Sequence, residues 1–201
     1  DKEFILISSN MLCESMKLTT LEEILYSLEN EVNEITLDED YYTTFDGCKL
    51  CYSDKKISDG LYIKSVKLLY QTSIENQEIQ MSEYDNFPIF FATYGKDQTL
   101  PFDIFAASFY LVSRYEEYLP HHKDYHQRFD FKDSLAYQKG FLHVPLVNKW
   151  ANLLANKLKE AYPDFVIPLR KFHFVNTIDV DSAYSFKQKG VFRNVGGFIR
   201  D

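Results

Sequence analysis

The sequence predicts an α/β domain in which helices flank a mixed sheet. Short apolar runs suited to buried strands alternate with longer segments whose apolar residues recur every three or four positions. The chain opens with such a strand–helix–strand pattern, which is typical of α/β folds. Its 201 residues are 45% hydrophobic and 26% charged, an ordinary globular composition that suffices for a packed core.

The first half of the chain supplies most of the expected strands. Residues 3–8 and 33–38 form the opening pair, and residues 12–29 between them are a predicted helix because four leucines share one face. The remaining strands are expected at 49–54, 61–70 and 86–94. A polar turn at 55–60 joins the first two of these.

Two helices are expected in the second half. Residues 101–118 are apolar nearly all round in their first part, which predicts a buried helix that ends before Pro120. A polar loop follows at 121–134. Residues 145–162 form the second helix, with Pro145 near its start and an apolar stripe that includes Trp150.

A boundary is expected near residue 165, because residues 162–171 carry two prolines. Residues 1–165 are therefore one predicted domain and residues 166–201 the start of another. The second part begins with a strand that ends in Asp179 and Asp181. Residues i and i+2 of a strand point to the same side, so both carboxylates could meet one cation. The alternative is that Asp181 caps a turn and Asp179 faces solvent.

Residues around these aspartates resemble a known family. "VNTIDVDSAYSFKQKG" is similar to the opening motif of the polysaccharide deacetylases, whose catalytic domain is a (β/α) barrel, and it carries one residue between the two aspartates. "FYLVSRYEEY", "HQRF" and "GFLHVPLVNKW" resemble an N-terminal domain of unknown function that precedes the barrel in one subgroup. The resemblance implies an accessory domain at 1–165 and a truncated deacetylase barrel at 166–201.

The resemblance also implies roles for both aspartates. Asp179 matches the general base that activates water, and Asp181 matches a ligand of a divalent metal ion, with zinc expected. The family completes its metal site with a downstream His-x-x-x-His pair, but this chain has no histidine after His173. We therefore expect a metal-dependent carbohydrate deacetylase in the complete protein and neither bound metal nor activity in this chain alone.

Three further motifs favour structural roles. Cys48 and Cys51 sit in an alternating, strand-like stretch that sends them to opposite faces, which argues against redox chemistry. Arg114 and Glu117 are spaced for an ion pair, with Glu116 in a glycosidase-like pair as the less favoured alternative. Arg128 is expected to be a buried anchor to Glu116 or Glu117.

His122 and His126 have the His-x-x-x-His spacing of a zinc pair on a helix. They follow Pro120 in a polar stretch without apolar periodicity, so solvated loop histidines are favoured. The aromatic residues are numerous, with 17 Phe and 15 Tyr. They predict mainly core packing, with a sugar-stacking surface as the alternative.

Charge and hydropathy exclude several classes of partner. The net charge of −8 argues against nucleic-acid binding and against a nuclease. No apolar run reaches membrane-spanning length. The three cysteines argue against a disulfide framework, and a cytoplasmic location is slightly favoured. The expected partner is a carbohydrate, with a homodimer through the exposed terminal strand as a further possibility. The rival function is a non-enzymatic carbohydrate-binding or protein-interaction module.

Overall fold

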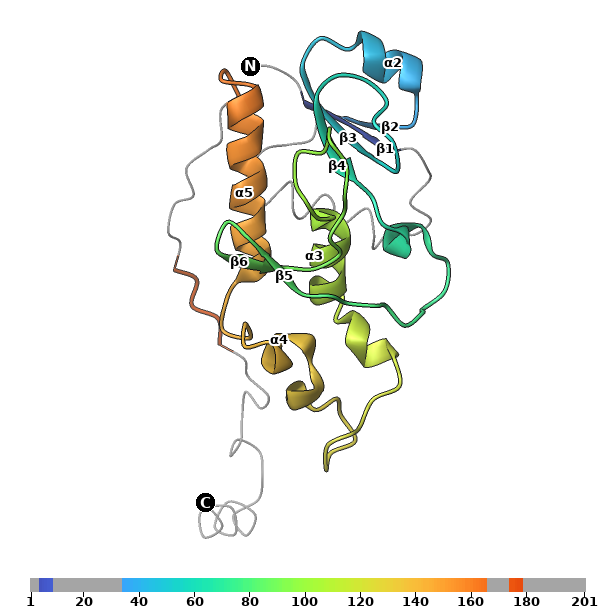
Figure 1. The fold of residues 1–201 in the computed structure, drawn as a ribbon. Coiled ribbons are helices and arrows are strands. Elements are labelled where there is room, and N and C mark those ends of the chain that lie inside the picture. The colour runs from blue at the N-terminus through green and yellow to red at the C-terminus, as the bar shows by residue number, and fades with distance from the viewer. Residues whose placement is uncertain (1–3, 9–33, 166–173, 179–201) are drawn as a thin grey trace, which may run out of the picture. The chain divides into compact units, whose positions relative to one another are not determined.

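The computed structural model describes residues 4–8, 34–165 and 174–178 (Figure 1). The chain divides into two units, residues 1–169 and residues 170–201, and the fold below is that of the first. The helix predicted at 12–29 lies outside the described residues, and so do Asp179 and Asp181.

A four-stranded parallel sheet forms one end of the first unit. Its strands are β1 (Phe4–Ser8), β2 (Glu34–Thr36), β3 (Cys48–Ser53) and β4 (Leu61–Lys64), in the order β2-β1-β3-β4. All three pairings are parallel, with Leu50 of β3 between Leu6 and Leu61. Every residue of β3 is buried, including the polar Lys49 and Ser53, as expected for a strand inside a parallel sheet. The strand expected at 61–70 is shorter, because Lys67–Tyr70 forms the 3-10 helix η1.

The connection between β3 and β4 is unusually short for parallel strands, which normally need a dozen or more residues. Gly60 makes this short connection possible because it adopts a φ of 101°. An added Cβ there would lie 2.7 Å from Cβ of Lys49. The Tyr162 hydroxyl accepts a hydrogen bond from the Lys49 backbone N–H at 3.0 Å. This bond satisfies a backbone N–H of β3 one residue before the pairing with β4 begins at Leu50.

A second, antiparallel sheet is the hairpin of β5 (Ser82–Tyr84) and β6 (Phe87–Ile89). Asp85 and Asn86 between them both have positive φ, as two-residue type I′ turns require. The strand predicted at 86–94 is therefore shorter, and Phe91, also at positive φ, turns the chain away from it. The fold is α/β with small parallel and antiparallel sheets flanked by helices, and the described residues close no barrel.

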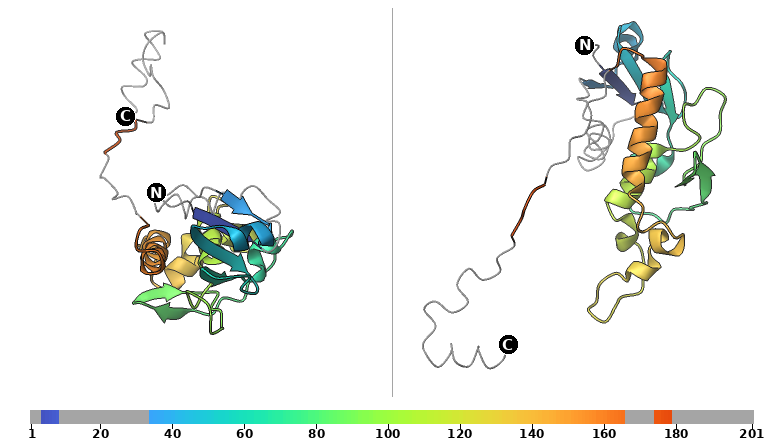
Figure 2. Two further views of the ribbon diagram at one scale, coloured as in Figure 1. Left: turned by 90° about the horizontal axis from the view of Figure 1, so that it is seen from above. Right: turned by 90° about the vertical axis from the view of Figure 1, so that its left-hand side faces the viewer.

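Four α-helices are described: α2 (Glu39–Thr44), α3 (Ile104–Val112), α4 (Leu135–Gln138) and α5 (Leu146–Ala161). The prediction at 145–162 is confirmed by α5. The prediction at 101–118 is correct only for α3, because Arg114 adopts a left-handed conformation and Tyr115–Tyr118 forms the 3-10 helix η2. Figures 1 and 2 show α5 running alongside α3, with the parallel sheet near its C-terminal end and α4 near its N-terminal end.

The core is built around α3 and one tryptophan. All residues of α3 from Ile104 to Tyr110 are buried, as its apolar sequence predicts. Trp150 of α5 is fully buried, packs against Phe90 and Phe102, and donates a hydrogen bond to the Pro88 carbonyl at 3.2 Å. This cluster connects α5 to the segment that precedes α3.

A buried carboxylate holds α3 to the sheet. Asp103 is fully buried, and its Oδ1 caps α3 by accepting from the backbone N–H groups of Phe105 and Ala106. Its Oδ2 accepts from the Tyr52 hydroxyl at 2.9 Å and the Val66 N–H at 2.7 Å. Burial raises the pKa of Asp103 to about 6 despite these four donors.

The cysteine prediction is confirmed for the two described cysteines. Cys48 belongs to the main core, whereas Cys51 packs with Tyr42 and Tyr62 in a separate cluster. Both are buried, and burial raises the pKa of Cys51. They are structural residues of β3. Within the described part of the chain, no helix has the length and apolar character needed to cross a membrane.

Candidate functional site

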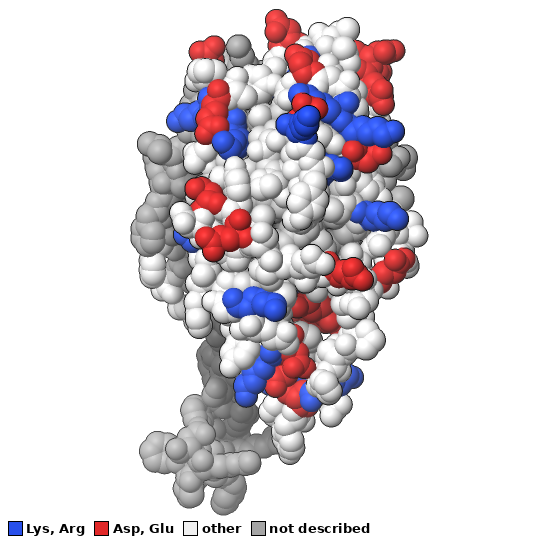
Figure 3. Space-filling view, in the orientation of Figure 1, with Lys and Arg blue, Asp and Glu red and all other residues white. Residues whose placement is uncertain are grey.

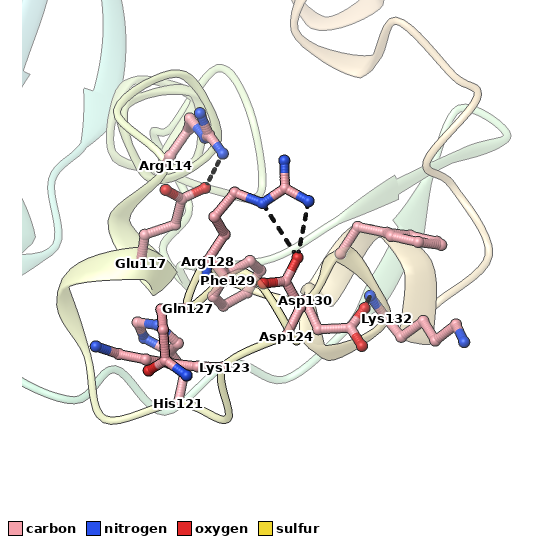
Figure 4. A pocket seen from close by; sticks show the side chains of 11 residues that line it. Arg114, Glu117, His121, Lys123, Asp124, Gln127, Arg128, Phe129, Asp130 and Lys132 are labelled. Carbon is pink, nitrogen blue, oxygen red and sulfur yellow. Dashed lines mark hydrogen bonds and ion pairs between the residues drawn. The ribbon is translucent and has the colours of Figure 1, made fainter.

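An open cleft of about 880 Å³ lies between η2 and the loop at 121–134 (Figure 4). This volume is within the range of ligand-binding pockets. The cleft is lined by four basic residues, three acidic residues, two aromatic residues, one histidine and one glutamine: Arg114, Lys123, Arg128, Lys132, Glu117, Asp124, Asp130, Phe129, Phe131, His121 and Gln127. We call it the charged cleft.

Arg114 stands where α3 ends. Its φ of 54° and ψ of 45° are left-handed values that cost a non-glycine residue roughly 1–2 kcal/mol. Its carbonyl accepts from the Glu117 backbone N–H at 2.9 Å, so η2 begins at once. The guanidinium pairs with the Glu117 carboxylate, which confirms the predicted ion pair.

Asp124 organises the loop on the other side of the charged cleft. Its Oδ1 accepts from the backbone N–H groups of His126 at 2.8 Å and Arg128 at 2.9 Å. Its Oδ2 accepts from Nε and Nη2 of Arg128 at 3.1 and 3.0 Å. The Arg128 backbone N–H is the main cause that lowers the pKa of Asp124, so the carboxylate is charged at neutral pH.

The expectation that Arg128 is a buried anchor to Glu116 or Glu117 is wrong. Its side chain is 70% exposed and its carboxylate partner is Asp124, within the same loop. Glu116 instead accepts from the Leu135 N–H at 2.6 Å and so holds the start of α4. Because Glu116 and Glu117 serve different partners, they form no glycosidase-like pair.

The histidines near the charged cleft do not form the zinc pair that their spacing allows. No helix forms at 121–128, and His122 is exposed, with Nδ1 3.6 Å from an Asp133 oxygen. His121 Nδ1 lies 2.8 Å from the Leu119 carbonyl oxygen, which can only accept, so Nδ1 is the donor of this bond. The described residues contain no group of three or more His, Cys, Asp or Glu side chains that could hold a metal ion.

Residues 6–163 match a family of unknown function, DUF7033. The chain belongs to this family. The DUF7033 match includes every residue of the charged cleft and ends before Asp179 and Asp181. A domain of unknown function agrees with the N-terminal part of the resemblance, while the match itself shows no deacetylase family. Neither the curated proteins nor the solved structures include a match to the chain.

Two motifs that carry the resemblance meet in the charged cleft of the DUF7033 domain. "RYEEY" contributes Arg114 and Glu117, and "HQRF" contributes Gln127, Arg128 and Phe129. Figure 3 shows acidic and basic side chains intermixed at the top, at the bottom and along both flanks of the visible face, with a mostly uncharged centre. The two motifs lie close in space, although "RYEEY" directly follows α3 and "HQRF" belongs to the loop at 121–134.

Sequence reasoning missed the remaining residues of the charged cleft. Lys123, Asp124, Asp130 and Lys132 belong to a stretch that was expected only to be a polar loop. The available signal was Asp124 with Arg128 four residues later, since aspartate often bonds backbone N–H groups two or more positions on. Most of the described aromatic residues are buried in the core or packed against it, as predicted, but Phe131 lines the charged cleft and is 54% exposed.

Proposed function

We propose that this chain is the N-terminal part of a metal-dependent polysaccharide deacetylase, and that its DUF7033 domain binds the carbohydrate in the charged cleft. One observation carries the proposal. The "RYEEY" and "HQRF" stretches, which resemble the domain that precedes a deacetylase barrel, line the same cleft. Residues of the "TIDVD" motif follow this domain in the sequence.

The lining of the charged cleft suits a sugar chain. Sugar hydroxyls both donate and accept hydrogen bonds, and the cleft offers guanidinium and ammonium donors together with carboxylate acceptors. Gln127 supplies both functions in one amide. Phe131 presents part of its ring, and aromatic faces pack against the apolar faces of amphipathic ligands. Aromatic and polar groups therefore face the same space.

The deacetylase part of the proposal depends on Asp179 and Asp181, which the structure does not describe. By resemblance, Asp181 would bind the divalent ion and Asp179 would accept a proton from water. The ion supplies Lewis-acid polarisation of the acyl carbonyl. The DUF7033 domain would hold the glycan and leave this chemistry to the following unit.

Glycan binding is tested by titrating the chain with N-acetylated chitotetraose in a calorimeter. We expect Phe131→Ala to weaken binding roughly tenfold, because it removes the exposed aromatic face. Tyr94→Ala is the matched control, since Tyr94 is also an exposed aromatic residue but lies outside the charged cleft. Equal affinities for wild type and Phe131→Ala would contradict carbohydrate binding at this cleft.

Acetate release tests the enzymatic part and requires a protein that contains this chain together with a barrel domain. Asp181→Ala should abolish metal-dependent release from an acetylated glycan, because the ion loses a ligand. Asp97→Ala is the control, as Asp97 is exposed and outside the charged cleft. Unchanged release after Asp181→Ala would refute the deacetylase proposal.

A protein-interaction module is the second candidate, favoured by an apolar groove of about 310 Å³ between the end of α3 and the start of α5. Val112 and Leu142 are exposed large hydrophobic residues in its lining. The test is whether Leu142→Arg releases a protein that the wild-type chain retains from its source cells. That result, together with no glycan binding, would favour this candidate over the carbohydrate proposal.

We also propose a homodimer through residues 174–178. The terminal strand predicted there is not formed over these described residues, which lie outside any helix or strand. In the described stretch 174–178, Phe174, Val175 and Ile178 are 81%, 75% and 77% exposed. An extended apolar segment with free backbone groups tends to pair with another strand. Light scattering should show a mass that doubles with concentration and stays monomeric after Val175→Pro. A wild-type monomer at all concentrations would contradict the dimer.

A further inference from the structure

Both arginines in the described part of the chain line the charged cleft. The basic residues elsewhere in that part of the chain are lysines. Arginine differs from lysine because its planar guanidinium presents five N–H donors in a fork that matches a carboxylate or phosphate. The lining of the charged cleft holds four basic and three acidic residues, a small positive excess on a chain with a net charge of −8.

A carboxylate orients each guanidinium but does not bond all of its N–H donors. Arg128 donates Nε and Nη2 to a single oxygen of Asp124, so Nη1 takes no part in this ion pair, and the side chain is 70% exposed. Arg114 donates one Nη2 bond to Glu117 and is 72% exposed. Figure 4 shows each guanidinium facing its own carboxylate. Donors therefore remain on both groups for a ligand.

Stability alone does not account for the two ion pairs. The arginine of each pair is about 70% exposed, and an ion pair screened by solvent in this way contributes little to folding. The loop also does not need the Arg128 side chain, because Asp124 Oδ1 already fixes the backbone through two N–H groups. Arg114 occupies a left-handed backbone position that glycine would fill without strain. An arginine that holds a strained left-handed backbone at an exposed turn indicates that its side chain has a function.

We propose that Arg114 and Arg128 form a two-arginine oxyanion site, and that the charged cleft selects an acidic carbohydrate chain. This inference rests on the proposed carbohydrate binding and adds the class of substrate. The oxyanion is a carboxylate or a phosphate on the glycan, both of which match a guanidinium fork. Lys123 and Lys132 add positive charge to the same lining.

The experiment compares three tetrasaccharide-sized probes by calorimetry at low salt: galacturonate, which carries carboxylates, ribitol phosphate, which carries phosphates, and neutral chitotetraose. We expect at least one acidic probe to bind about tenfold more tightly than chitotetraose. The stronger of the two identifies the oxyanion. Raising the ionic strength should weaken acidic binding and leave the neutral probe unaffected.

Arg114→Gly and Arg128→Gln test the residues. Each should weaken the acidic probe about 10- to 100-fold, because a charge-assisted hydrogen bond is lost. Chitotetraose binding should weaken by a clearly smaller factor, since a neutral hydroxyl makes a weaker hydrogen bond with a guanidinium than an oxyanion does. Arg114→Gly should also keep or raise the melting temperature, since it removes the left-handed strain. Lys157→Gln is the matched control, because it removes a cation paired with Glu160 at 2.7 Å outside the charged cleft.

The outcomes separate this inference from the function on which it rests. Equal binding of acidic and neutral probes, or arginine variants that weaken both equally, would overturn the two-arginine site and leave carbohydrate binding intact. Absence of binding to all three probes would overturn both. A melting temperature that falls sharply in both arginine variants would show that these side chains are structural.

Discussion

Replacing Asp103 tests the fold at its most connected buried polar group. Asp103→Ala removes the acceptor of four hydrogen bonds. Loss of the helix cap costs about 1 kcal/mol. The buried Tyr52 hydroxyl and the half-buried Val66 N–H both lose this acceptor, which costs about 1–3 kcal/mol. We therefore expect the free energy of unfolding to fall by about 3 kcal/mol at pH 7.

The pH dependence of this loss has a definite sign. Burial raises the pKa of Asp103 from 3.8 to about 6, so the folded chain binds this proton more tightly than the unfolded chain. Its contribution to stability is full below about pH 4 and is lost as the pH rises through about 6. The variant lacks this contribution, and its deficit against wild type should be roughly 1 kcal/mol larger at pH 5 than at pH 7.

Urea denaturation followed by the fluorescence of Trp150, the one tryptophan in the chain, measures both quantities. Asp103→Asn is the control, because it keeps one oxygen to cap α3 but cannot ionise. Its deficit should be about 1–3 kcal/mol, from an amide facing the Val66 N–H. A loss below about 1 kcal/mol for Asp103→Ala, or a smaller deficit at pH 5, would refute the reasoning.

Three further predictions concern β3 and its connections. In a Cys13→Ser background, a thiol reagent should label Cys48 and Cys51 only after urea is added, because both are buried; rapid labelling of the folded chain would contradict this. Tyr162→Phe removes the hydroxyl bonded to the β3 backbone and should cost about 1–2 kcal/mol in urea denaturation, with no change if the bond is unimportant. Gly60→Ala should lower the melting temperature by several degrees, because the φ of 101° and a 2.7 Å contact with Lys49 both exclude a Cβ. An unchanged melting temperature would refute the role of Gly60 in the short connection between β3 and β4.

Local sequence pattern predicted the elements whose stability is local. The apolar run of β1 and the alternating pattern of β3 predicted strands correctly, and the amphipathic stripe of α5 predicted a helix correctly. The end of α3 was placed six residues too late, at 118 instead of 112, because nothing in the sequence marks Arg114 as left-handed. The strand predicted at 86–94 was too long, because no feature of the sequence indicates the positive φ of Phe91.

The charged cleft shows a second limit of sequence reasoning. The Arg114–Glu117 pair was predictable because its spacing is local. The Arg128–Asp124 pair is also local, yet it was missed because the composition of the loop suggested only solvated side chains. The approach of "RYEEY" to "HQRF" depends on how η2 and the loop fold back on each other, which neither stretch determines alone.

The most direct test of carbohydrate binding is an NMR titration of the isotope-labelled chain with the acidic and acetylated tetrasaccharides. The account predicts that the largest shift changes fall on the backbone amides of 121–132 and on the guanidinium signals of Arg114 and Arg128. Signals of the parallel sheet should stay in place. Changes centred on the apolar groove beside Leu142, or no changes at all, would contradict the charged cleft as the binding site.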